Sequence, residues 1–99
     1  MYVVREIMHC KPGKVRPLVE KFQKMGEVME KLGLSRPRVM TDVSGPRFWT
    51  LVAEFEVESL AAFFEMDDKA FADAGAGEIM AGYHDLVDLG RREIYKLEG

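Results

Sequence analysis

The stretch YVVREIMHCKPGK, residues 2–14, decides the fold because it contains an apolar strand that is ended by a sharp turn. Its first nine residues are rich in Val, Ile and Met, and the Pro-Gly pair that follows is a turn signal. Arg5, Glu6 and His9 nevertheless lie inside the strand, and Cys10, the single cysteine, ends it. A strand that buries such side chains needs partners for its charges as well as for its apolar groups.

The segment from about residue 14 to residue 57 reads as a helix and then a hairpin. Residues 14–32 carry apolar side chains at spacings of three and four, which predicts one amphipathic helix closed by Gly33. Residues 37–43 and 47–57 are rich in β-branched and aromatic side chains. They flank Ser44-Gly45-Pro46, which predicts a hairpin with a three-residue turn.

The C-terminal part reads as a second helical region and a last strand. Ser59 is placed to cap the helical region, and the glycines at 75, 77 and 82 should divide it into two or three pieces. Residues 91–97 predict the last strand. The order β-α-β-β-α-β predicts one α+β, ferredoxin-like domain over residues 1–99, with a four-stranded antiparallel sheet whose first and last strands are neighbours.

Composition excludes several classes of protein. The 99 residues carry a net charge of −3 with scattered basic residues, which disfavours a nucleic-acid partner. The longest apolar stretches are only strand-sized and the start lacks a signal-peptide pattern, so we expect no membrane span and a cytoplasmic protein. A chain this short buries only roughly 60–65% of its unfolded surface when it folds alone, so a partner subunit would ease its marginal core.

Two strands of the expected sheet carry large apolar groups on both faces. On the first, Val3, Arg5, Ile7 and His9 point one way and Tyr2, Val4, Glu6, Met8 and Cys10 the other. On the third, Trp49, Leu51, Ala53 and Phe55 oppose Phe48, Thr50 and Val52. Helices can cover one face, and a second copy of the sheet could cover the other. This predicts a homodimer closed as a β-barrel.

The same arrangement offers partners for the charges. The tripeptide Arg-Glu-Ile occurs at residues 5–7 and again at 92–94, on strands that should be adjacent and antiparallel. Arg5 with Glu93, or Glu6 with Arg92, would then face each other as structural cross-strand pairs.

Several segments resemble the dimeric α+β barrel superfamily, particularly its antibiotic-biosynthesis-monooxygenase-like and NIPSNAP-like groups. They are the strand ending in CKPGK, the helix running to EKLGL, RFWTLVAEFEVESLAAF, and the closing LVDLGRREIYKLEG. The resemblance implies a homodimer with a cavity between sheet and helices or within the barrel. Relatives include oxygenases that act on aromatic polyketides without a cofactor and enzymes that degrade haem. The latter use an asparagine, and this chain contains none.

Five residues are candidates for a site. His9, near a strand end, is the candidate general base, because an imidazole titrates near neutral pH. Arg5 and Trp49 would orient and stack a flat ligand, and Tyr83 and His84 would line its cavity. Each has a plainer alternative: a hydrogen-bonded histidine at a strand end, a paired arginine, or an aromatic packed in the core or interface.

Two broader features complete the site predictions. The side chains of Phe63, Phe64, Met66, Phe71, Ile79 and Met80 form an apolar helical face that is either core or an adaptable pocket wall. With two histidines far apart and no Cys-x-x-Cys or Glu-x-x-His spacing, we expect neither a metal nor a cofactor.

Two functions stay open on this sequence. One is a cofactor-independent, monooxygenase-like enzyme acting on a small aromatic or flat apolar substrate. The other is a non-catalytic binding or assembly module whose polar residues are structural pairs.

Overall fold

The computed structural model describes residues 1–99 and contains four strands and four helices. The elements follow in the order β1 (Tyr2–Cys10), α1 (Val15–Lys31), β2 (Arg38–Thr41), β3 (Thr50–Val57), α2 (Leu60–Ala72), α3 (Ala74–Met80), α4 (Tyr83–Leu86) and β4 (Val87–Lys96). The strands lie in the order β2-β3-β1-β4, and every neighbouring pair is antiparallel. The predicted ferredoxin-like α+β fold, with first and last strands adjacent, is confirmed.

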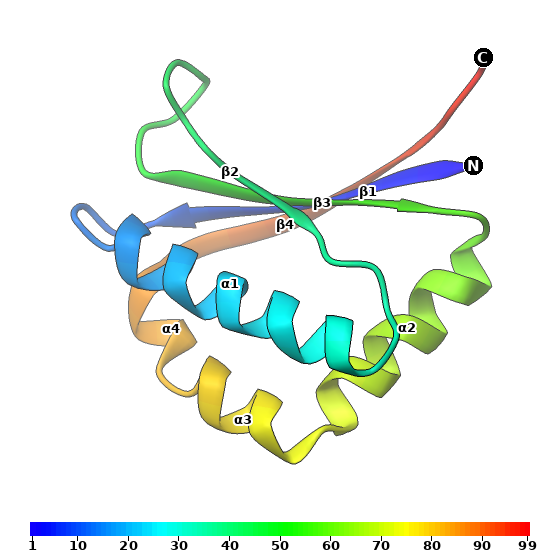
Figure 1. The fold of residues 1–99 in the computed structure, drawn as a ribbon. Coiled ribbons are helices and arrows are strands. Elements are labelled where there is room, and N and C mark those ends of the chain that lie inside the picture. The colour runs from blue at the N-terminus through cyan, green and yellow to red at the C-terminus, as the bar shows by residue number, and fades with distance from the viewer.

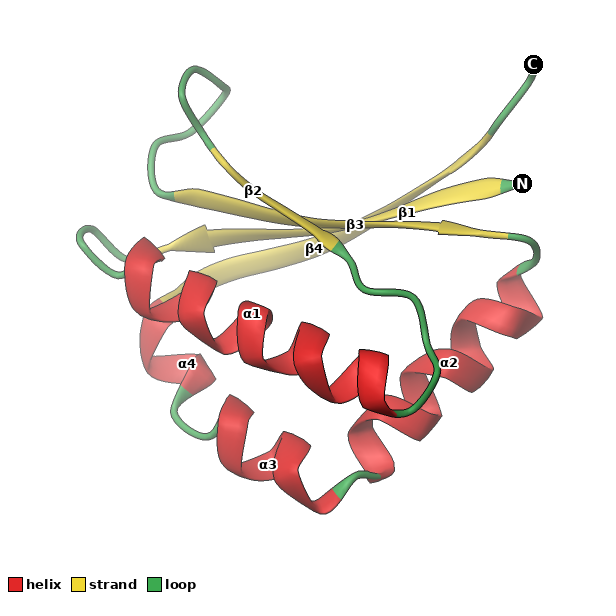
Figure 2. Cartoon of the chain, in the orientation of Figure 1, coloured by secondary structure: helices red, strands yellow, loops and turns green.

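All four helices cover one face of the sheet and leave the opposite face bare (Figures 1 and 2). The core on the helix side forms two clusters, and β1 contributes to both. One contains Val4, Met25, Met29, Val57, Phe63, Met66, Ala70 and Ala76, and the other contains Met8, Cys10, Leu18, Val19, Leu51 and Ala53. We call the other side, which carries Val3, Arg5, Ile7 and His9 of β1, the open face. The alternation predicted for β1 is therefore confirmed.

Local chemistry explains where the helices begin and end. The hydroxyl oxygen of Ser59 accepts a hydrogen bond from the Ala62 amide at 3.0 Å, which caps α2 as predicted. Asp73 ends α2 and caps α3, its carboxylate accepting from the Gly75 amide at 3.0 Å. Gly82, with φ of 80°, separates α3 from α4. The helical region is thus divided as expected, but Gly75 and Gly77 lie within α3 and do not break it.

The connection between β2 and β3 is longer than the predicted three-residue turn and spans residues 42–49. Asp42 begins it: its carboxylate accepts the Thr50 amide at 2.7 Å while its own amide donates to the Thr50 carbonyl at 3.2 Å. Trp49 ends it with φ of 60°, a left-handed conformation that takes the backbone out of the extended path. The hairpin prediction is correct, but its turn and the strand status of residues 47–49 were wrong.

The last strand begins at Val87, earlier than the predicted residue 91, directly after the short helix α4. No helix is both long enough and apolar enough to cross a membrane.

Candidate functional site

A pocket of about 420 Å³ lies between the sheet and the helices. Ten of its fifteen lining residues are hydrophobic, and its apolar wall is dominated by Met8, Met25, Met29, Met66, Met80, Phe22, Phe55 and Phe71. Because methionine is flexible and polarizable, such a wall can adapt to the outline of a bound molecule. The volume lies within the range of small-molecule sites, about 300–1,000 Å³. We call it the helix-side pocket.

An ion pair from the sheet gives this pocket a polar end. The antiparallel register of β1 and β4 sets Glu6 opposite Arg92, on the side that faces the helices. Arg92 Nε donates to Glu6 Oε1 at 2.5 Å, and the Arg92 guanidinium carbon lies 5.0 Å from the ring centre of Phe63. The predicted cross-strand pair therefore forms, and it lines the helix-side pocket.

Tyr83 and His84, both on α4, line the same pocket. Their rings meet edge to face with centres 4.8 Å apart. The Tyr83 hydroxyl donates to the sulfur of Met8 at 3.8 Å, and a thioether is a weak acceptor. The phenol therefore keeps most of its capacity to donate to a ligand.

Asp67 is a pocket residue that the sequence analysis missed. It lies on α2, is half-buried, and has no hydrogen-bond partner within the protein. Burial raises the pKa of its carboxyl and the neighbouring Asp68 adds to this, while Arg92 opposes it. One signal could have found it: Asp67 follows the buried Phe63 by four residues, so both occupy one side of the helix.

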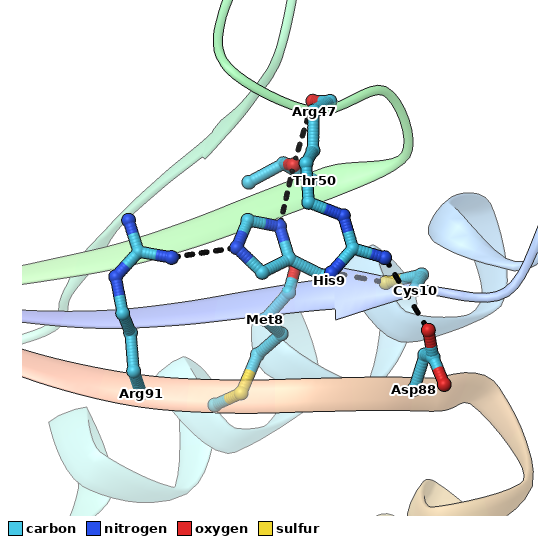
Figure 3. Close-up of polar contacts among 7 residues, drawn as sticks. All are labelled: Met8, His9, Cys10, Arg47, Thr50, Asp88 and Arg91. Atoms are coloured by element: carbon cyan, nitrogen blue, oxygen red, sulfur yellow. Dashed lines mark hydrogen bonds and ion pairs between the residues drawn. The ribbon is translucent and has the colours of Figure 1, made fainter.

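His9 lies on the open face, away from the helix-side pocket, and both of its ring nitrogens have partners (Figure 3). Arg91 Nη1 lies 2.6 Å from Nε2, and Thr50 Oγ1 lies 3.0 Å from Nδ1. Because a guanidinium can only donate, Nε2 must accept, so the imidazole is neutral and its Nδ1–H donates to Thr50. Thr50 in turn donates to the Arg47 carbonyl at 2.9 Å.

The electrostatics agree with this neutral state. Burial lowers the pKa of His9, and the charges of Arg47 and Arg91 lower it further, whereas Asp88 opposes them. Asp88 itself is paired with Arg47 at 3.3 Å. The arrangement matches the plainer expectation for His9, and its role as a base remains a prediction for a ligand bound on the open face.

Arg5 also lies on the open face, and its ion-pair partner differs from the predicted one. The register sets Arg5 opposite Glu93, as expected, but Arg5 Nε donates to Glu54 Oε1 at 2.7 Å, and Arg38 bonds the other oxygen. The hydrogen bond from Arg5 is the main cause of the lowered pKa of the buried Glu54 carboxyl. Glu93 instead accepts from Arg91 at 3.1 Å and from the Tyr95 hydroxyl at 3.0 Å. Arg5 pairs with Glu54 rather than with Glu93 because the Glu54 carboxylate is buried and offers one oxygen to Arg5 and the other to Arg38.

Trp49 lies outside the helix-side pocket, in the connection that precedes β3, with 44% of its surface exposed. The sequence candidates therefore separate into two groups. Glu6, Tyr83, His84 and Arg92 meet at the helix-side pocket, whereas Arg5, His9 and Glu93 lie on the open face. No three histidine, cysteine, aspartate or glutamate side chains gather where they could share a metal ion.

An antiparallel sheet covered on one face by helices, with an apolar pocket between the layers, defines an α+β protein of the ferredoxin-like class. Neither a protein-family model nor a curated protein sequence matches the chain. Solved structures do match it. A NIPSNAP family protein of unknown function from Agrobacterium tumefaciens aligns with a TM-score of 0.81 and 18% identity, over 98% of this chain and 87% of that one.

Two further structures extend the likeness. A NIPSNAP domain protein from Burkholderia xenovorans aligns with a TM-score of 0.79 and 14% identity, covering 98% of this chain and 94% of that one. A protein from Nitrosomonas europaea, named a candidate antibiotic biosynthesis monooxygenase, aligns over both whole chains with a TM-score of 0.72 and 15% identity. The chain therefore has the fold of NIPSNAP and antibiotic-biosynthesis-monooxygenase-like proteins, as the sequence resemblance predicted.

Proposed function

We propose that the chain binds a small, flat apolar or aromatic molecule in the helix-side pocket and oxygenates it without a cofactor. The observation that carries the proposal is the pocket itself, whose lining combines a wall of methionines and phenylalanines with a few polar side chains, among them the Glu6–Arg92 ion pair. Flat aromatic molecules match both parts, because their rings contact thioethers and phenyl groups while a ring oxygen reaches the polar end. The name of the Nitrosomonas europaea neighbour points to the same chemistry.

The chemistry needs a substrate that loses a proton easily. Removal of one proton from a CH2 group leaves a carbanion that adds molecular oxygen, which gives a peroxide on the same carbon. Loss of the second hydrogen of that carbon then breaks the O–O bond, so that one oxygen atom stays as a carbonyl and the other leaves as water with the two hydrogens. The protein then has to hold the substrate away from bulk water and accept its proton. His84 and Asp67 are the pocket groups that can accept it, and Arg92 and Tyr83 can stabilise the negative oxygen of the enolate.

Oxygen consumption with anthrone, a flat ketone with an acidic C–H, tests the enzyme. We expect the protein to accelerate uptake, and Phe71→Ala to weaken anthrone binding by about tenfold through loss of aromatic contact area. Phe64→Ala is the matched control, because Phe64 is comparably exposed on the same helix but does not line the pocket. Binding without accelerated oxygen uptake would favour the non-catalytic module. If anthrone does not bind, or if Phe71→Ala and Phe64→Ala lose equal affinity for it, the pocket hypothesis is refuted.

We further propose that a second copy of the chain covers the open face, as in a dimeric barrel. This face leaves Met40, Leu89 and Tyr95 41–55% exposed, and its central charges are already paired within the chain. Burying the centre of this face would therefore gain apolar contacts without stranding a charge there.

Sedimentation velocity at several dilutions checks this assembly. We expect a dimer that Leu89→Lys converts to monomer, while Leu60→Lys on the helix side leaves it intact. A wild-type monomer at every concentration would contradict the assembly but leave the pocket proposal standing.

A further inference from the structure

The polar groups of the helix-side pocket differ in how far the protein itself satisfies them. Glu6 and Arg92 form a direct ion pair at 2.5 Å, so each neutralises the other. Asp67 has no such partner, although every fully buried polar side-chain atom elsewhere in the chain has one. The pocket therefore contains one carboxylate whose hydrogen-bonding capacity is unused.

The half-burial of Asp67 makes this unused capacity significant. Water reaches the carboxylate only partly, and burial is the main cause of its raised pKa. A ligand O–H or N–H pointing at it would replace lost hydration with a charge-assisted hydrogen bond. An ammonium group fits less well, because the positive charge of Arg92 is close enough to act on the same carboxyl.

Tyr83 supplies the complementary group. It lies on α4, whereas Asp67 lies on α2, and its hydroxyl has only the thioether of Met8 as acceptor. A carbonyl or hydroxyl oxygen on a ligand is a much stronger acceptor than a thioether. The pocket thus offers an acceptor from one helix and a donor from another, in a lining that is mostly apolar.

We propose that Asp67 and Tyr83 determine the specificity of the pocket. The ligand is a flat apolar molecule with a hydroxyl group that donates to Asp67 and a carbonyl or second hydroxyl oxygen that accepts from Tyr83. This inference rests on the proposed function, because it names the substrate class of the same pocket.

Two matched probes test it: 2-acetyl-6-hydroxynaphthalene and its methyl ether, in which a methyl group replaces the hydroxyl hydrogen and removes the donor. Titration calorimetry of the wild-type protein should show the hydroxy compound binding about tenfold more tightly, the value of one charge-assisted hydrogen bond at a partly exposed site. Asp67→Ala should remove that preference, and Asp67→Asn, which keeps an acceptor, should retain part of it. Asp68→Ala is the matched control, because Asp68 is the exposed neighbour on α2 and does not line the pocket.

Tyr83→Phe separates the two contacts. The ketone is common to both probes, so this variant should weaken both by the same factor and leave the preference for the hydroxyl unchanged. Circular dichroism establishes that each variant is folded. Equal wild-type affinities for the two probes, or a preference that survives Asp67→Ala, would overturn the inference while the pocket proposal stands. If neither probe binds, both proposals fail.

Discussion

Glu54 should be the carboxylate on which the stability of the open face depends most. It is 6% exposed and accepts hydrogen bonds from Arg5 and Arg38, whose side chains are 44% and 74% exposed. A hydrogen bond to a charged group contributes about 1.5–3 kcal/mol, and solvent screening of the two arginines reduces this. Since glutamine keeps one acceptor oxygen, Glu54→Gln should cost about 1–2 kcal/mol of unfolding free energy at pH 7.

The effect should depend on pH in a defined direction. The pKa of Glu54 is lowered in the folded chain, so its stabilisation is fully present above the unfolded value of about 4.3. It is lost as the pH falls through the folded value, because both states are then protonated. The difference between wild type and Glu54→Gln should therefore shrink steadily below pH 4.

Urea denaturation at a fixed protein concentration measures this effect. With a slope near 1 kcal/mol/M for a chain of this size, the midpoint should fall by about 1–2 M at pH 7 and much less at pH 3. Glu56→Gln is the matched control, because Glu56 lies on the same strand and face but is exposed and unpaired. An equal loss in the control, or an undiminished difference at pH 3, would refute the reasoning.

Four other predictions concern single positions. The pKa of His9 is lowered, so the protein should lose stability as the pH falls below about 6.5, where the unfolded imidazole takes up a proton. Melting temperatures at pH 7.5 and 5.5 should show a smaller difference in His9→Gln than in the wild-type protein. Gly90→Ala places a Cβ 3.3 Å from the sulfur of Met8, which lines the helix-side pocket, and should therefore weaken binding of the naphthalene probes severalfold. Gly77→Ala meets open space and should stabilise α3 by about 0.5–1 kcal/mol. Cys10 is buried with a raised pKa, so iodoacetamide should modify it far more slowly in native buffer than in urea, and equal rates would contradict its burial.

The elements that sequence alone predicts well are those with local causes. β1 ends where predicted because a Pro-Gly turn follows it, and Ser59 begins α2 through a bond to an amide three residues away. The connection between β2 and β3 could not be predicted in the same way. It depends on the Asp42 carboxylate reaching the Thr50 amide and on a left-handed tryptophan, and neither follows from propensity.

The site was predictable in part for a related reason. The repeated Arg-Glu-Ile tripeptide and the strand order are enough to pair Glu6 with Arg92. That this pair lines a pocket depends on where the helices leave space, which the sequence does not specify. Arg5 lies near both Glu54 and Glu93, and it forms its ion pair with Glu54 because that carboxylate is buried.

The adjacency of β1 and β4 has a consequence for how the chain acquires its structure. The central strand, residues 2–10, pairs with residues 87–96, and the Leu97 amide donates to the Met1 carbonyl at 3.0 Å. Closing so large a loop is entropically costly and makes folding slow compared with a helical bundle of equal length. During synthesis at about 5–20 residues per second, β1 leaves the ribosome on the order of ten seconds before its partner strand. An apolar strand exposed for that long is a target for chaperones and for aggregation, and the charges of Arg5 and Glu6 give it some protection in the interval.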